Sequence, residues 1–326
     1  MAQLFPRSRD CLQHLPTNRR NHRARTHLIV GLGLLVGLSA CTPDFDSVWL
    51  VKDLRVLAVQ SEPPEVFVDR DASSYPPVQL TALVADPRAD KTTVRWQAWA
   101  CTSDERRCND DAALRVQFAS GESPIGPISV PFTVTRELLD RAIAVDPYKP
   151  PEGFPLELPG KYPLGGVAVT IELRFDDDPY QVIATKRVVY GVEDPPGRTP
   201  NRNPEVTVAF DGAQVERLAP GESITVVPQP GSNSKEAYEA RTITTTGLGV
   251  ASLSEYLSYS FFTSAGVVSH ERTGGKPSPF IDNKKVEDTT IQFQTPSAVG
   301  AGTLWVVVRD DRGGVNWQTI PFEVRP

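Results

Sequence analysis

Residues 167–175 read Val-Ala-Val-Thr-Ile-Glu-Leu-Arg-Phe, with a large apolar side chain at every odd-numbered position. This alternation places the apolar side chains on one face of a β-strand, whereas a helix would need them three and four residues apart. The next four residues, Asp-Asp-Asp-Pro179, are typical of a turn. We therefore predict a half-buried strand, a tight turn and an antiparallel return strand over 181–190.

Other apolar runs in the first half of the chain also indicate strands. They cover 54–59, 78–84 and 93–99, and prolines, aspartates or loop residues bound them. One helix interrupts this pattern over 136–145, with Thr135 placed to cap it. The apolar face of that helix consists of Leu138, Leu139, Ala142 and Ile143.

A proline-rich segment divides the chain. Residues 193–204 contain four prolines and show no apolar periodicity, so we predict a stiff linker over 193–203. A second set of short β runs follows it. These runs cover 204–210, 223–227, 238–246, 256–263, 267–271, 289–293, 303–309 and 318–324.

The fold expected from these patterns is all-β, with two Ig-like β-sandwich domains in tandem over 52–192 and 204–326. An α/β plan would need long amphipathic helices between the strands, and the sequence lacks them. A chain of 326 residues is long enough for two domains of ordinary size.

An apolar run near the N-terminus predicts export. It extends from His27 to Cys41, behind a cluster of arginines, and is too short for a comfortable membrane span. The tetrapeptide Leu38-Ser39-Ala40-Cys41 resembles the lipobox of bacterial lipoproteins, which implies a lipoprotein signal peptide over 1–40 and a lipidated Cys41. An ordinary secretory peptide with a chance cysteine is the alternative.

The resemblance to lipoproteins also implies a location. Residues 41–51 would form a short lipidated tether, and several acyl chains would give a stable membrane anchor. In such lipoproteins an aspartate after the cysteine usually means inner-membrane retention, and Thr42 occupies that position here. We therefore expect the outer membrane, with the periplasmic and the surface face both left open.

The charge of the chain excludes two classes of partner. The whole chain carries −6, and six arginines against one aspartate precede Cys41, so the remainder is more acidic still. Nucleic acids and anionic lipid surfaces both require basic clusters. The lipid anchor, rather than electrostatic attraction, would hold the protein at the membrane.

Two segments of the second domain resemble a known class of repeat. Residues 304–317 and 259–266 are similar to the closing and middle strands of bacterial Ig-like or PKD-like repeats, and 51–58 is similar to the start of uncharacterised myxobacterial lipoproteins. The resemblance implies sandwich domains and no activity. It departs from antibody domains because no cysteine pair brackets Trp96.

Cys101 and Cys108 are the cysteines that follow Cys41. An exported chain meets an oxidising compartment, so we expect a disulfide that closes this short loop. Free thiols are the next alternative. A metal site would need further soft ligands, and no histidine lies near.

Residues with catalytic or ligand-binding chemistry are sparse. His270 is flanked by Ser269 and Glu271, but the interpretation favoured here is an exposed residue at a strand end. The aspartates at 176–178 and 310–311 could hold calcium, although aspartates are also common turn formers. Among the tryptophans, we expect Trp96 and Trp305 in the core and Trp99 and Trp317 to be more exposed. We predict no cofactor and no resident metal.

The function expected from these observations is that of a non-catalytic envelope lipoprotein, a binding or structural module. The alternative is a carbohydrate-active hydrolase that uses acidic residues. Partner binding is expected in loops, which cover 148–162, 274–281 and 310–314. Phe280 and Ile281 are the candidate contact residues for an envelope protein or polysaccharide, with packing back onto the sandwich as the alternative.

Overall fold

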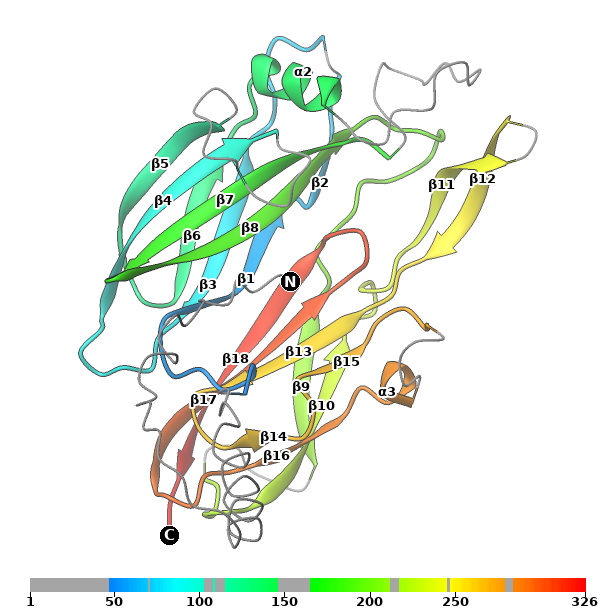
Figure 1. The fold of residues 1–326 in the computed structure, drawn as a ribbon. Coiled ribbons are helices and arrows are strands. Elements are labelled where there is room, and N and C mark those ends of the chain that lie inside the picture. The colour runs from blue at the N-terminus through cyan, green and yellow to red at the C-terminus, as the bar shows by residue number, and fades with distance from the viewer. Residues whose placement is uncertain are drawn as a thin grey trace, which may run out of the picture. The chain divides into compact units, whose positions relative to one another are not determined.

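The computed structural model describes residues 47–69, 71–102, 108, 115–145, 165–211, 217–244, 247–278 and 284–326. Most of these residues lie in β-strands, and most of the strands belong to two sandwiches, each made of two facing sheets (Figure 1). The all-β prediction with two Ig-like sandwiches is therefore confirmed. In the described part of the chain, no helix is long and apolar enough to cross a membrane.

The first sandwich is built from residues before the proline-rich segment. One sheet has the order β1 (Arg55–Glu62), β3 (Val78–Ala85), β6 (Pro127–Phe132). The facing sheet has the order β2 (Glu65–Phe67), β8 (Tyr180–Gly191), β7 (Val167–Asp177), β4 (Thr93–Cys101), β5 (Arg115–Pro124). All neighbouring strands are antiparallel except β2 and β8, which run parallel. Their inner faces enclose a single apolar core.

The alternation in β7 is confirmed on its inner face. The side chains of Val167, Val169, Ile171, Leu173 and Phe175 are all buried. Asp177 pairs with Tyr180, so Asp178-Pro179 forms the predicted tight turn into β8. Thr170 and Glu172 on the other face are also buried, which the alternation did not predict.

The predicted helix is α2, Arg136–Ala144. The hydroxyl oxygen of Thr135 accepts a hydrogen bond from the backbone N–H of Leu138 at 3.2 Å, as an N-cap should. Leu138, Leu139 and Ala142 are buried in the first core, and Ile143 packs against it.

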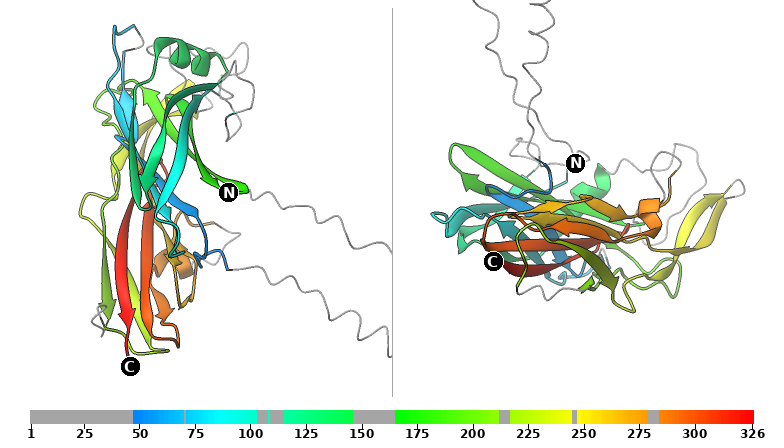
Figure 2. Two further views of the ribbon diagram at one scale, coloured as in Figure 1. Left: turned by 90° about the vertical axis from the view of Figure 1, so that its left-hand side faces the viewer. Right: turned by 90° about the horizontal axis from the view of Figure 1, so that it is seen from below.

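The second sandwich follows the proline-rich segment. One sheet has the order β14 (Val267–Val268), β16 (Ile291–Gln294), β10 (Ser223–Pro230), β9 (Val206–Asp211). The other has the order β15 (Arg272–Gly274), β13 (Ser258–Thr263), β17 (Gly300–Arg309), β18 (Val315–Val324). They enclose a second core, and the short helix α3 (Lys284–Glu287) lies between β15 and β16 in the chain. Figure 2 shows the sheets of both sandwiches from two further directions.

One hairpin stands apart from both sandwiches. Strands β11 (Ala237–Thr244) and β12 (Gly247–Ser254) pair with each other and with no further strand among the described residues (Figure 1). The sequence predicted β11 but not β12, whose glycines and serine weaken the strand pattern. Strands β2, β5, β6 and β15 were likewise not predicted.

The proline-rich segment separates the two sets of sheets, because no sheet in the described residues contains strands from both sides of it. The last residues of the predicted tether are not free, however. The backbone of Trp49 and Val51 exchanges hydrogen bonds with Thr263 of β13, at 2.9 and 2.8 Å. The side chain of Val51 is fully buried. The chain therefore pairs with β13 of the second sandwich before it forms the first strand of the first sandwich.

Candidate functional site

Several of the predicted site residues lie outside the described residues. These include Cys41, Phe280 and Ile281, as well as the whole loop over 148–162. Lipidation at Cys41 and partner binding by Phe280 and Ile281 stay predictions.

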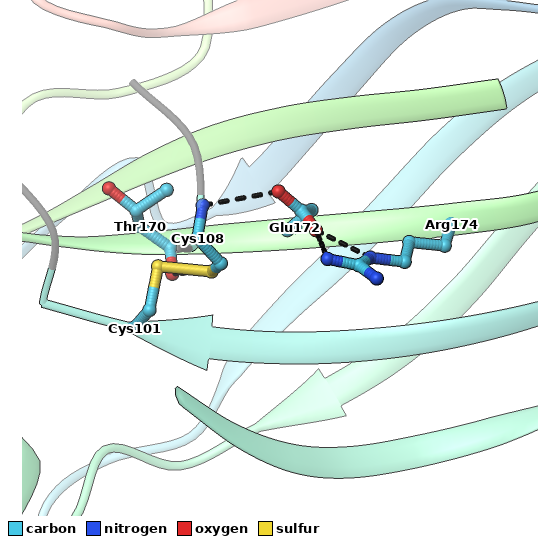
Figure 3. Close-up of a disulfide and its surroundings, with 5 residues drawn as sticks. All are labelled: Cys101, Cys108, Thr170, Glu172 and Arg174. Carbon is cyan, nitrogen blue, oxygen red and sulfur yellow. Dashed lines mark hydrogen bonds and ion pairs between the residues drawn. A yellow bond between two sulfur atoms is a disulfide. The ribbon is translucent and has the colours of Figure 1, made fainter. Parts of the chain in front are cut away.

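Cys101 and Cys108 form the predicted disulfide (Figure 3). The backbone N–H of Cys108 donates to Glu172 Oε2 at 3.1 Å, and Nε of Arg174 donates to Glu172 Oε1 at 2.6 Å. Glu172 is only 1% exposed. This carboxylate lies on the outer face of β7 and ties the cysteine loop to the sheet, which explains why the alternation of burial fails there.

Replacing both cysteines by serine should lower the free energy of unfolding by about 2 kcal/mol, because the bridge closes a short loop in the unfolded chain. Urea denaturation without reductant measures the difference. With reductant present, wild type and the double variant should unfold together. Identical curves in non-reducing conditions would contradict a stabilising bridge.

Three of the four predicted tryptophan positions differ from the prediction. Trp305 is buried as expected, but Trp96 is half-buried, with its indole Nε1 donating to Ser123 Oγ at 3.0 Å. Trp99 is half-buried rather than exposed, because the guanidinium groups of Arg115 and Arg174 lie over its ring. Trp317 is half-buried as well and packs against an apolar cluster.

The aspartates and the histidine occupy structural positions. Asp177 forms an ion pair with Arg88 at 2.8 Å, and Asp310 Oδ1 accepts hydrogen bonds from the backbone N–H groups of Arg312 and Gly314. Among the described residues, no three His, Cys, Asp or Glu side chains are grouped so that they could hold a metal. His270 is exposed, with Nδ1 3.1 Å from Ser269 Oγ.

The most elaborate polar arrangement lies where residues of the two sandwiches meet. An apolar cluster forms its base, with Leu57, Ala58, Leu83 and Ala85 from β1 and β3 against Trp305, Val307 and Val315 from β17 and β18. The residues 304–308 are therefore buried on both faces, since Leu304, Val306 and Val308 belong to the second core. The turn over 310–314, predicted as a binding loop, enters this contact region.

Arg312 is the centre of the polar part. Its guanidinium donates to Glu65 of β2 at 2.8 Å, to Glu255 at 3.2 Å and to Glu236 at 3.4 Å, and it lies over the ring of Tyr238. The side chains of Arg312 and these three glutamates are each less than a tenth exposed. We call this group the Arg312 cluster: Arg312, Glu65, Glu236 and Glu255.

The proline-rich linker is bound into the same region. The backbone N–H of Asn201 donates to Glu65 Oε2 at 2.8 Å, and Arg198 pairs with Oε1 of the same carboxylate. Asn203 bridges the two sandwiches, because its Nδ2 donates to Ser61 O at 2.8 Å and its Oδ1 accepts from Val315 N at 2.9 Å. The linker is thus held by specific hydrogen bonds, in addition to any stiffness from its prolines.

Burial decides the proton affinity of the acids in this region. It raises the pKa of Glu255 to about 7, and the negative charges of Asp310 and Glu236 act in the same direction. The hydrogen bond from the backbone N–H of Glu236 and the positive charge of Arg312 lower this pKa and offset part of the effect. Burial also raises the pKa of Asp310, although the backbone N–H of Gly314 and the amide of Asn201 oppose it. Arg198 also pairs with Glu65 and Arg202 with Glu236, whereas Glu255 has Arg312 as its only ion-pair partner among the described residues.

Replacing Arg312 by methionine should lower the free energy of unfolding by about 3 kcal/mol at neutral pH, because it leaves the buried Glu255 without a cation and takes one of two cations from Glu65 and from Glu236. The loss should shrink toward pH 4, where the carboxylates take up protons. Chemical denaturation at both pH values measures this. The matched control is Arg325→Met, which breaks an exposed pair with Glu323 and should change little. An equal effect of both substitutions would show that the cluster is not a stabilising centre.

A pocket opens beside this cluster. Its volume is about 390 Å³, and it is lined by residues 56–59 of β1, residues 183–187 of β8, and Arg309, Gly313 and Val315 from the β17–β18 hairpin. Lys186 donates from Nζ to the carbonyl of Gly313. Arg309 donates to Ser260 Oγ at 3.1 Å and to Leu57 O at 2.9 Å.

Three cations line this pocket, the exposed Arg187 and the more enclosed Lys186 and Arg309, and the structure gives Lys186 and Arg309 no acidic partner among the residues it describes. In the described part of the chain, no carboxylate oxygen lies within 4.0 Å of Lys186 Nζ or of the Arg309 guanidinium. Burial lowers the pKa of Lys186 to about 8, with Asp310 opposing and Arg309 adding to the effect. Burial also lowers the pKa of Arg309 to about 10. The pocket is therefore an electropositive, partly apolar enclosure.

The Lys186 ammonium should make folding stability depend on pH in a defined window. Between pH 8 and 10.5 the unfolded chain still binds a proton that the folded chain has released, so stability should rise as pH rises through this window. The full effect is about 3 kcal/mol. The measurement is the difference in unfolding free energy between wild type and Lys186→Met across pH 7 to 11, which cancels the other titrating groups. A constant difference would contradict the lowered pKa.

The sequence did not single out Lys186, Arg309 or Arg312. A signal for Lys186 was present, since the inward-facing row of β8 reads Val182, Ala184, Lys186, Val188, Tyr190 once its register with β7 is known. A lysine within such an apolar row is unusual. Arg309 lies on the same face of β17 as Trp305 and Val307, and this face is turned toward the first sandwich. Nothing in the sequence identified which residues pack against that face.

The comparisons with known proteins concern the fold. No protein-family model and no curated protein matches the chain. Among solved structures, it is similar to red sea bream transglutaminase, with 9% identity over 85% of this chain and 32% of that chain, and a TM-score of 0.24. It is also similar to Escherichia coli α2-macroglobulin, with 8% identity over 86% and 22% of the two chains and a TM-score of 0.25.

A third similar structure is the adhesin InvE of Yersinia pseudotuberculosis, with 11% identity over 81% of this chain and 58% of that chain, and a TM-score of 0.19. The chain covers less than two thirds of each of these proteins. At such TM-scores the similarities carry no functional argument, so the function has to be argued from the residues of this chain.

Proposed function

We propose that this protein is a non-catalytic lipoprotein of a bacterial outer membrane, which acts as a binding or structural module and is anchored through a lipid on Cys41. The observation that carries the module role is the contact region between the sandwiches, where an apolar cluster, the Arg312 cluster and the linker hydrogen bonds lie together. Residues 47–326 form one compact unit. Domains joined by a small polar interface usually move relative to each other, whereas this region combines apolar and ionic contacts.

The anchoring role rests on the sequence. Leu38-Ser39-Ala40-Cys41 ends an apolar run in the order that resembles a lipobox. Ser47 is the sixth residue after Cys41, so at about 3.3 Å per extended residue the chain between them can span at most roughly 20 Å. Within the described residues, the chain that follows the anchor segment first contacts the second sandwich, since Trp49 and Val51 are hydrogen-bonded to Thr263 of β13.

The positions of the buried acids favour a module over a hydrolase. A glycoside hydrolase needs two carboxyl groups that face each other across an open cleft. Glu65, Glu236 and Glu255 instead accept hydrogen bonds from Arg312, and Glu65 and Glu255 accept backbone N–H groups as well. Their oxygens are engaged in holding the chain together.

Expression of the full chain in a Gram-negative host with a radioactive fatty acid tests the anchor. Wild type should be labelled and should fractionate with the outer membrane, and Cys41→Ala should lose the label because the acceptor thiol is gone. The double variant with serine at 101 and 108 is the matched control and should keep the label.

Two results would contradict the proposal. Labelling that persists in Cys41→Ala would remove the anchor. Release of reducing sugar from envelope polysaccharides by the purified protein, abolished in Glu255→Gln at unchanged stability, would replace the module by an enzyme.

A further inference from the structure

We propose that the pocket between β1, β8 and the β17–β18 hairpin binds the carboxylate of a small organic acid, with Lys186 and Arg309 as its charged contacts. This site is independent of the lipid anchor, and it includes Gly313 of the 310–314 turn. It assigns a ligand class to a part of the molecule that the module role leaves unexplained.

The first argument is the placement of Lys186. Its cross-strand partner is Ile171, a core residue, so Lys186 shares the inner face of its sheet with the first core. It is only 7% exposed. An unpaired buried ammonium is costly, and a sequence that needed only stability would place an apolar residue in this row. The position is explained if the ammonium serves a ligand.

The second argument is the number of unused donors. Lys186 has three N–H groups and one acceptor among the described residues, the Gly313 carbonyl. Arg309 has five N–H groups and two acceptors, Ser260 Oγ and Leu57 O. Both side chains line the same pocket. Donors of two cations therefore remain available at one site for an oxygen-rich anion.

The third argument concerns the kind of anion. Val56, Val59, Ile183, Ala184 and Val315 also line the pocket, so the ligand should have an apolar body. A volume of about 390 Å³ is in the range of small-molecule sites. Asp310 acts on Lys186 from the hairpin and offsets part of the positive charge. Arg187 lines the pocket too but is exposed, so Lys186 and Arg309 less Asp310 leave a charge that suits a single carboxylate better than a phosphate dianion.

The ligand would also join the two sandwiches. Lys186 belongs to β8 of the first, and Arg309 belongs to β17 of the second. A carboxylate shared by the two would add a contact across the region that the Arg312 cluster already bridges. Ligand binding should therefore raise the thermal stability of the whole described unit.

The test is calorimetric titration of the full purified chain with benzoate and with butyrate at pH 7. Benzamide serves as an uncharged analogue of benzoate, and inorganic phosphate serves as an anion that has no apolar group. We expect the carboxylates to bind and both comparison probes to bind at least about tenfold more weakly. Lys186→Met and Arg309→Met should each weaken benzoate binding by about tenfold or more, and the exposed Arg325→Met should leave it unchanged.

A second measurement uses only the wild-type protein, so it does not depend on whether the variants fold. Bound carboxylate favours the charged ammonium, so benzoate should raise the pKa of Lys186 in the wild-type protein, followed by NMR of the lysine side chain. Arg309, Arg187 and Asp310 are the charged groups around it, and of these Arg309 opposes the charged state. Equal binding of benzamide, tighter binding of phosphate, no binding by either carboxylate, or an unchanged Lys186 pKa would each overturn the proposal.

Discussion

The structure depends on one buried guanidinium that several carboxylates share. Arg312 lies at the tip of the β17–β18 hairpin, and it reaches Glu65 in the first sandwich and Glu236 and Glu255 at the base of the β11–β12 hairpin. In water such pairs contribute little, but here the side chains are withdrawn from solvent, so each charge requires its partner. Three separate parts of the chain are therefore tied to one side chain.

The hairpin can deliver that side chain because its turn is unusually constrained. Asp310 accepts the backbone N–H groups of Arg312 and Gly314, which fixes the turn. Gly314 has no space for a Cβ, which would come within 2.1 Å of Asp310 Oδ2 and 2.8 Å of Arg202 O. The linker therefore packs directly on the hairpin backbone. The same close approach leaves the Lys186 and Arg309 pocket at the edge of the contact region.

Much of the fold could be predicted from the sequence because its signals are local. Alternation in β7, the capped helix α2 and the tight turn at Asp178-Pro179 depend on neighbouring residues, and the structure contains all three. The disulfide was predictable from the expectation of export, because an oxidising compartment favours a bond between two cysteines seven residues apart. The candidate site was not predictable in this way, since its charged residues come from β2, β8, β17 and the base of a separate hairpin, far apart in the sequence.

By itself, the sequence determined the all-β class, the strands with clear apolar patterns, among them the apolar run at 304–308, and the place where the two sets of sheets divide. Only the tertiary structure decided what covers the second face of that run, because burial demands an apolar neighbour but does not say which one. It likewise decided that Asp310, Arg312 and Gly314 of the turn at 310–314 are held by hydrogen bonds within the chain, while Asp311 and Gly313 stay exposed. Ion pairs act through space, and Arg312 meets Glu65 across 247 residues of chain. No local pattern of residues can encode such a meeting.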